Sequence, residues 1–214
     1  MKLVRLLVAA MTLAGACLIG RAAYMHAKAE LAAVLIHCAW EESVRLGKAS
    51  PPWPWADTQP VARLLIPRLG YDEIVLEGAS PRTLAFGPAR LLSGARLGEP
   101  GNLEVAGHRT SWFRPLEALR TGDNVEVQWF DAHRGQLRQR YYTVESIHIV
   151  LPEEVGLLAP TSEDALTLIT CYPFGHSPRS PQRYVVRALP TNSSHATGDA
   201  VTAIRTLPSK FRGF

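Results

Sequence analysis

Hydrophobic and polar residues alternate with different periods in successive parts of this chain. From Leu6 to Gly20 fifteen residues carry no charge, and Arg5 and Arg21 flank the run. A fifteen-residue helix spans roughly 22 Å, and the apolar neighbours on both sides lengthen it toward the roughly 30 Å of a bilayer core. The pattern predicts a tilted membrane anchor over residues 1–25, with a basic N-terminus in the cytoplasm and the remainder exported.

Other interpretations of this N-terminal run stay open. The small residues Ala14, Gly15 and Ala16 fit a signal-peptidase site, and Cys17 directly after them fits a lipoprotein signal. A buried helix of a soluble protein has a similar composition, although a basic pair close to the N-terminus argues against it.

The next segment, residues 26–50, predicts an amphipathic stalk helix. Its residues are strong helix formers, and its larger apolar side chains recur near helical spacing at Leu31, Val34, Leu35, Cys38 and Val44 or Leu46. Gly47 and the Pro- and Trp-rich linker at residues 51–60 end the helix. The apolar stripe either packs on the chain's own domain or lies on a membrane with Trp53 and Trp55 among the headgroups.

After residue 60 the pattern changes to short runs rich in β-branched residues and separated by turn residues. Seven runs read as strands: Val61–Ile66, Glu73–Leu76, Asn102–Ala106, Asn124–Phe130, Arg140–Val150, Ala165–Thr170 and Gln182–Ala188. Three segments between them read as single helical turns: Arg82–Phe86, Pro115–Leu119 and Pro152–Leu158. Seven or eight strands in about 140 residues predict a mainly β domain, closed as a barrel or packed as a sandwich.

Composition and charge limit the function classes. The 214 residues are 47% hydrophobic with a mean hydropathy of −0.00, enough for a buried core. The net charge of +4 divides into +3 before residue 51, −1 over residues 51–190 from fourteen Arg against fifteen acids, and +2 in a tail at 191–214 predicted to be disordered. A neutral domain without a basic face argues against nucleic-acid binding. No Cys and His pair has metal-ligand spacing, and no cofactor is predicted.

Cysteine usage points to a reactive thiol. Cys17 and Cys38 fall in the predicted helices, which leaves Cys171 as the single cysteine of the β domain. An unpaired thiol in an exported domain suggests a nucleophile, while a small buried core residue is the alternative.

Three strand ends carry complementary chemistry. Cys171 follows the predicted strand at 165–170, His108 follows the strand at 102–106, and Arg183 opens the last strand. A thiol, an imidazole and a guanidinium are the groups that nucleophilic cysteine catalysis needs for attack, proton transfer and stabilisation of an oxyanion.

These residues resemble the signatures of sortases, which are membrane-anchored cysteine transpeptidases. The resemblance rests on the segments AGH at 106–108, TLITC at 167–171 and RYVV at 183–186. It implies a closed eight-stranded β-barrel over residues 61–190 with short helices and a preceding membrane helix. The leader and the PWPWAD segment at 52–57 resemble the proteobacterial subgroup, which implies an inner-membrane anchor and a periplasmic domain.

The resemblance also implies roles for individual residues. Cys171 would attack an LPxTG-like C-terminal sorting signal of a protein substrate and form a thioacyl intermediate. Arg183 would stabilise the oxyanion, and His108 would protonate the leaving amine and then activate the incoming one. Further substrate contacts are expected at Thr170, Tyr172 and His176. The amine acceptor is not specified by the sequence.

Several alternatives remain beside this interpretation. Arg179 and Arg187 compete with Arg183 for the oxyanion role. A peptidase that only hydrolyses and a membrane-tethered, non-catalytic binding module are the competing functions. A papain-type peptidase needs its cysteine before its histidine, and an L,D-transpeptidase usually shows a Ser-His-Gly-Cys-Arg run, so both are disfavoured.

Overall fold

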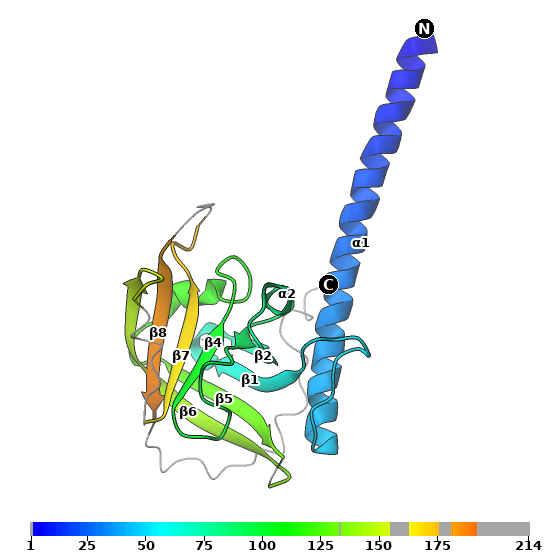
Figure 1. Cartoon of the computed structure of the whole chain (residues 1–214). Coiled ribbons are helices and arrows are strands. Elements are labelled where there is room, and N and C mark those ends of the chain that lie inside the picture. The colour runs from blue at the N-terminus through cyan, green and yellow to red at the C-terminus, as the bar shows by residue number, and fades with distance from the viewer. Residues whose placement is uncertain (1, 133, 155–162, 176–180, 192–214) are drawn as a thin grey trace.

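The computed structural model describes residues 2–132, 134–154, 163–175 and 181–191. In chain order the elements are α1 (Lys2–Leu46), β1 (Pro60–Ile66), η1 (Pro67–Leu69), β2 (Tyr71–Glu77), α2 (Pro81–Leu84), β3 (Ala89–Arg90), β4 (Asn102–Ala106), η2 (Arg114–Ala118), β5 (Asn124–Asp131), β6 (Gln136–Val150), β7 (Ala165–Cys171) and β8 (Arg183–Pro190). Figure 1 shows a β-barrel with the long helix α1 along one side.

The eight strands close into one barrel in the order β1-β2-β3-β4-β7-β8-β6-β5. The pairs β2 with β3 and β4 with β7 are parallel, and the other pairs are antiparallel. The closed eight-stranded barrel expected from the family resemblance is confirmed, and all seven predicted strands are present. The eighth strand, β3, has only two residues, which is too short for a period-two pattern to show.

Alternation along the strands divides the barrel's interior from its outer surface. The central core contains Leu103 and Val105 of β4, Leu166 and Leu168 of β7, and Tyr184 and Val186 of β8. Since successive side chains of a strand point to opposite faces, the intervening residues of these three strands lie on the outer face. This alternation determines which residues at the ends of these strands project from the outer face of the barrel.

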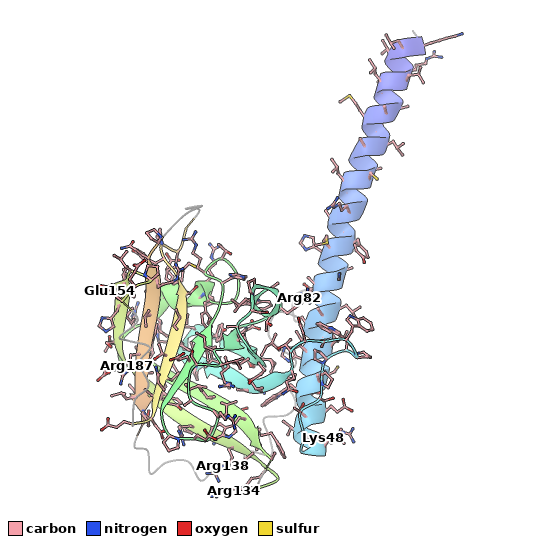
Figure 2. All side chains as sticks on the ribbon, in the orientation of Figure 1. Lys48, Arg82, Arg134, Arg138, Glu154 and Arg187 are labelled. Carbon is pink, nitrogen blue, oxygen red and sulfur yellow. The ribbon has the colours of Figure 1, made fainter. Side chains whose placement is uncertain are left out.

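Helix α1 runs without a break from the predicted anchor through the predicted stalk. One window of 18 residues has a mean hydropathy of 2.1, so the helix is long and apolar enough to cross a membrane. Large apolar side chains in its first half are exposed, among them Leu7, Met11 and Ile19, and Figure 2 shows this half of the helix extending beyond the barrel. The N-terminal half therefore has the character of a membrane segment, and the C-terminal half contacts the barrel.

The buried face of α1 differs from the face predicted by its large apolar residues. The residues that pack on the barrel are Ala32, Ile36, Ala39, Trp40 and Ser43. Leu31, Val34 and Cys38 of the predicted stripe are instead exposed. Of the predicted stripe, Val44 packs against the same cluster as Ile36 and Trp40, and Leu35 is half-buried. The prediction was therefore wrong for three positions of the stripe and not for the whole face.

A second buried cluster joins α1 to the barrel. Ile36 and Trp40 share it with Ile74 and Leu76 of β2 and with Ala89 of β3. In the linker, Trp53 adds an edge-on contact to Phe86 at 5.3 Å between ring centroids, while Trp55 is 82% exposed. The helix is thus packed on the β2–β3 side of the barrel.

The remaining predicted segments have mixed outcomes. The turns near residues 82–86 and 115–119 correspond to α2 and η2, whereas most of Pro152–Leu158 lies outside the described residues. The 191–214 tail lies outside them too, apart from Thr191, whose amide donates to the carbonyl of Tyr141 at 2.9 Å.

Candidate active site

Cys171 and Arg183 face each other across the β7–β8 ladder. They are the last register pair of these antiparallel strands, one step beyond Thr170 and Tyr184. Directly opposed residues have Cβ atoms about 4.5–5.5 Å apart and project from the same face of the sheet. The ladder therefore places the Arg183 side chain next to that of Cys171 on the same face of the sheet.

The end of β4 reaches the same place from the other side of β7. The parallel register pairs Ala106 with Ile169, and the Gly107 amide donates to the Ile169 carbonyl at 3.1 Å. The Thr170 hydroxyl then donates to the Gly107 carbonyl at 2.7 Å. His108 follows Gly107 directly, so this end of β4 brings it to the end of β7 that carries Cys171.

Cys171 and Arg183 lie on the outer face of the barrel, because they alternate with the inward-facing residues of β7 and β8. His108 lies at the start of the turn that follows β4. Cys171 is partly exposed and His108 is exposed. The three strand ends that carry the thiol, the imidazole and the guanidinium therefore converge at one solvent-accessible edge of the barrel.

The turn after His108 is held by its main chain. The His108 carbonyl accepts hydrogen bonds from the amides of Ser111 at 3.3 Å and Phe113 at 3.0 Å. Phe113 is fully buried and closes this end of the core. A Cβ atom on Gly107 would lie 2.7–3.0 Å from three atoms of the Phe113 ring, so only glycine fits between the strand end and the ring.

Replacing Gly107 with alanine is expected to displace the His108 turn. The added methyl group overpacks a fully buried ring, which we expect to cost about 1–3 kcal/mol in the free energy of unfolding. A shift of about 1 Å in the imidazole is expected to lower kcat by roughly 100-fold. Urea unfolding and peptide turnover measure the two effects. Gly175→Ala, where a Cβ meets nothing within 4 Å, is the control and should leave the unfolding free energy nearly unchanged.

Arg183 and its competitors differ in what they bind. Arg183 donates to the main-chain carbonyls of Gln182 at 3.2 Å and Pro181 at 3.4 Å, and within the described part of the chain it forms no ion pair. Arg187 pairs with Glu145 at 3.4 Å and lies further along β8, away from the catalytic end (Figure 2). Arg179 lies outside the described residues. A guanidinium without a carboxylate partner is the better donor for a developing oxyanion.

Aromatic residues support the reactive edge. Tyr172 and Tyr184 stack at 6.3 Å, and Phe174 meets Tyr184 edge-on at 4.8 Å. Burial raises the pKa of Tyr184, so its hydroxyl keeps its proton and donates to the Leu116 carbonyl at 3.2 Å. These contacts join the strand ends to η2 and make the edge rigid.

The expected substrate contacts occupy different environments. Thr170 is 3% exposed, and its hydroxyl is used by Gly107. Tyr172 is half-buried beside the site, and His176 lies outside the described residues. Their roles toward substrate stay predictions. Sequence reasoning missed Arg109, whose guanidinium donates to the Pro173 carbonyl at 2.9 Å and joins the loops after β4 and β7. Its position next to His108 was the only available signal.

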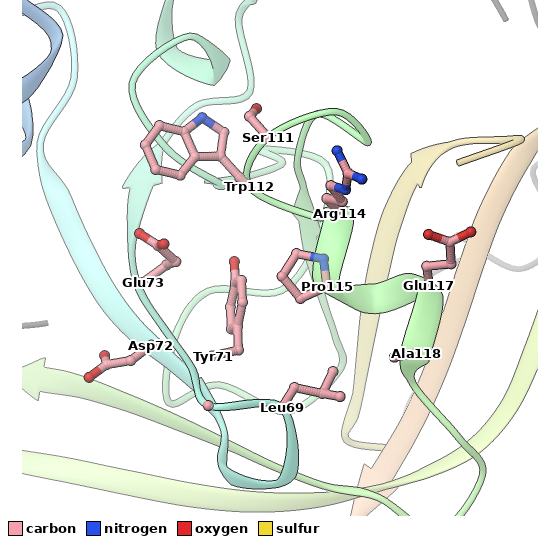
Figure 3. Close-up of a pocket in the computed structure, with 11 residues that line it drawn as sticks. Leu69, Tyr71, Asp72, Glu73, Ser111, Trp112, Arg114, Pro115, Glu117 and Ala118 are labelled. Atoms are coloured by element: carbon pink, nitrogen blue, oxygen red, sulfur yellow. The ribbon is translucent and has the colours of Figure 1, made fainter. Parts of the chain in front are cut away.

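An open pocket of about 650 Å³ adjoins this end of the barrel. Its walls are the start of β2 with the preceding turn and the segment from Ser111 to Ala118 (Figure 3). The second wall begins in the turn that His108 anchors. The lining includes the carboxylates of Asp72, Glu73 and Glu117 and one guanidinium, Arg114. Sequence patterns gave no indication of this pocket.

Tyr71 is the unusual residue of the pocket. It is 5% exposed, and its hydroxyl has no hydrogen-bond partner within the described residues. Burial, with added repulsion from Glu73 and Asp72, raises the pKa of Tyr71 well above its usual value, so the hydroxyl is neutral. Figure 3 shows this hydroxyl directed toward the space between Glu73 and Pro115. Asp72 itself is neutralised by Arg63, with which it forms two hydrogen bonds of 2.6 and 2.7 Å.

Comparison with known proteins gives a consistent result. Sortase D of Bacillus subtilis is 26% identical over 124 residues, which cover 58% of this chain and 60% of that protein. Sortase A from Corynebacterium diphtheriae is 27% identical with a TM-score of 0.57, covering 66% of this chain and 65% of that structure. The Sortase D5 transpeptidase of Clostridium perfringens has a TM-score of 0.57 at 21% identity, over 71% of this chain and 93% of that one.

The family model for the sortase domain matches residues 64–191, which is more than half of the chain and includes every strand from β2 to β8. The barrel topology and the three strand ends described above lie within this match. The chain therefore belongs to the sortase family.

Proposed function

We propose that this protein is a cysteine transpeptidase that cleaves a C-terminal sorting signal and transfers the released acyl group to an amine. The observation that carries the proposal is the convergence of one end each of β4, β7 and β8, next to which His108, Cys171 and Arg183 stand. Membership of the sortase family supports it. Each residue has a distinct part in the reaction.

In the first step the Cys171 sulfur attacks the carbonyl carbon of the scissile amide, and the proton of the thiol passes to His108. Arg183 donates hydrogen bonds to the oxygen that becomes negative, a position available to it across the ladder. As the tetrahedral species collapses, the carbon–nitrogen bond breaks and His108 gives the proton to the leaving amine. The product is a thioester on Cys171.

In the second step an amine attacks the thioester carbonyl. His108 accepts the proton of that amine, the new carbon–nitrogen bond forms, and the carbon–sulfur bond breaks to release Cys171. Water in place of the amine gives hydrolysis through the same intermediate. Two acyl transfers of moderate difficulty thus replace one direct exchange of amides.

The outer face beside the thiol supplies a floor for the peptide. The register places Ala106, Ile169 and Val185 side by side on β4, β7 and β8, one outward row below the reactive groups. These side chains are apolar and leave no polar group to desolvate. We infer that apolar residues of an LPxTG-like signal lie on this row.

We place the amine acceptor in the pocket lined by Tyr71, Glu73 and Trp112, because its wall continues directly from the His108 turn. An ammonium group suits a pocket with more carboxylates than guanidinium groups, and the Tyr71 hydroxyl supplies an unused acceptor. A carboxylate on the same acceptor would meet Arg114.

Glu73→Gln is expected to raise the KM for an amine such as lysine about tenfold, because it removes the negative charge while leaving the hydrolytic rate unchanged. Tyr71→Phe is expected to weaken binding of the amine acceptor to a similar extent. The free energy of unfolding should stay the same or rise, since an unsatisfied buried hydroxyl costs about 1–3 kcal/mol. The ratio of aminolysis to hydrolysis and thermal unfolding measure these effects. An unchanged ratio in both variants contradicts the placement; exposed Glu99→Gln is the control.

We further propose that α1 holds the enzyme in the cytoplasmic membrane as a single-pass anchor, with the domain exported. The helix is long and apolar enough to span a bilayer. Lys2 and Arg5 on its N-terminal side favour a cytoplasmic N-terminus.

Incubation of the full chain in detergent with a peptide library, with and without added amines, tests the function. We expect cleavage at one bond of an LPxTG-like motif, and an amide product when amine is present. Hydrolysis without any amide product, even when amine is present, would support the peptidase alternative. Absence of cleavage together with an unreactive Cys171 would support the non-catalytic binding module.

A further inference from the structure

The barrel is attached to α1 in a way that fixes the direction of its catalytic end. Figure 1 shows β8 running away from the N-terminus of α1, so Arg183 at its start lies at the end of the barrel nearer the membrane segment. Cys171 is its register partner and shares this end. The opposite end of the barrel carries the β5–β6 hairpin, where Figure 2 shows Arg134.

The helix has no hinge between the membrane segment and the barrel. From Arg21 to Leu46 the sequence contains neither glycine nor proline, and the structure is helical throughout. Sharp helix kinks arise almost always at such residues or at inserted bulges. Four of the five buried helix residues, Ile36, Ala39, Trp40 and Ser43, are at most 7% exposed within eight positions, so two helical turns are clamped to the barrel.

The height of the thiol above the membrane follows from the register. Ile36 shares a buried cluster with Leu76 and Ala89, and the ladders connect Leu76 to Ala89, Ala89 to Ala106 and Ala106 to Ile169. Cys171 lies two residues, roughly 7 Å, beyond Ile169 toward the membrane. Ile36 lies fifteen residues, roughly 22 Å, beyond Arg21, the first charge after the apolar run. Strands of a closed barrel are tilted by about 35–45°, so each of the three ladder steps also shifts the level by up to about 3 Å. Together these distances place Cys171 within roughly 25 Å of the level of Arg21.

We infer that α1 acts as a rigid spacer that presents the catalytic end to the lipid surface, so that the enzyme processes bonds held within roughly 25 Å of the headgroups. The inference rests on the proposed function for its substrate and on the fold alone for its geometry. A sorting signal that is tethered to the same membrane reaches Cys171 through a short spacer. A scissile bond held far from the bilayer does not reach Cys171. The helix thereby selects substrates by position as well as by sequence.

Short-range quenching by lipids with nitroxide headgroups tests the geometry independently of activity. The full chain, with Cys17→Ala and Cys38→Ala, carries a fluorophore on Cys171 and is reconstituted in phosphatidylcholine vesicles. In the matched control Cys171→Ala is added and the fluorophore sits on Arg134→Cys at the opposite end. We expect severalfold stronger quenching at Cys171. Equal quenching at both positions, or stronger quenching at position 134, overturns the inference.

A second variant separates a rigid spacer from a flexible tether. Seven helix-forming residues inserted after Lys28 lengthen α1 by two turns, about 10 Å, and should sharply reduce quenching at Cys171. For a membrane-tethered peptide substrate the optimal spacer should lengthen by about three residues, with the rate on the soluble peptide unchanged. An unchanged spacer optimum contradicts the rigid spacer. Loss of the soluble-peptide reaction in the unmodified chain would instead contradict the proposed function.

Discussion

Replacing Cys171 with serine is expected to reduce both transpeptidation and hydrolysis by about 10⁴-fold or more, to the background rate. The thiol is the group that bonds to substrate, and removal of a nucleophile disables all the groups that act with it. A serine hydroxyl at the end of β7 has the same neighbours but is a far weaker nucleophile without a strong base. Release of the C-terminal fragment from a cleaved peptide, followed by mass spectrometry, gives the rate.

The change should leave the barrel intact. Cys171 is only partly buried, so thermal unfolding of the variant is expected within a few degrees of the native chain. Cys38→Ser is the matched control, because Cys38 is exposed on α1 and should be replaceable without loss of activity. Turnover that persists in Cys171→Ser and disappears in Cys38→Ser would contradict this prediction, because it would identify Cys38 as the nucleophile.

Replacing Arg183 with alanine is expected to lower kcat by about 10²–10³-fold, which corresponds to about 2.7–4 kcal/mol, the usual cost of removing one oxyanion donor. The KM for the peptide should change little, since the guanidinium acts on charge that develops only in the transition state. Because Cys171 itself remains, its alkylation by iodoacetamide should continue.

Arg187→Ala is the matched control for this experiment. Both arginines project from the outer face of β8, but Arg187 is already paired with Glu145 and lies four residues further from the reactive edge. We expect the turnover of Arg187→Ala to remain within about twofold of the native rate. An equal loss in both variants would show a general electrostatic effect and would remove Arg183 from the oxyanion role.

Short runs rich in β-branched residues and bounded by turn residues predicted seven of the eight strands of the barrel. This pattern could not reveal β3, whose pairing of Ala89 and Arg90 with β4 depends on the neighbouring strands. For α1 the predicted stripe omitted Ile36 and Trp40, which contact the barrel together with small residues such as Ala32 and Ala39. Local pattern identifies an element, whereas its partner decides which face is buried.

The candidate catalytic residues could be proposed from the sequence because each stands at the end of a recognisable strand. Their supports were not, since they depend on contacts between distant segments. The fit of Gly107 against Phe113 and the Arg109 bond to Pro173 both require the closed barrel. The pocket around Tyr71 likewise arises only where the start of β2 meets the segment after His108.

The central claim is that Cys171 carries the acyl group between donor and acceptor. The most direct measurement is the mass of the Cys171-containing fragment after the full chain is mixed with a cleavable sorting-signal peptide and quenched in acid. The account predicts an added mass equal to the N-terminal part of the peptide, attached at Cys171 and removed by hydroxylamine. In His108→Ala the same adduct should accumulate only if that variant still carries out the first step. Product formation without any adduct on Cys171, or with an adduct on another residue, would contradict it.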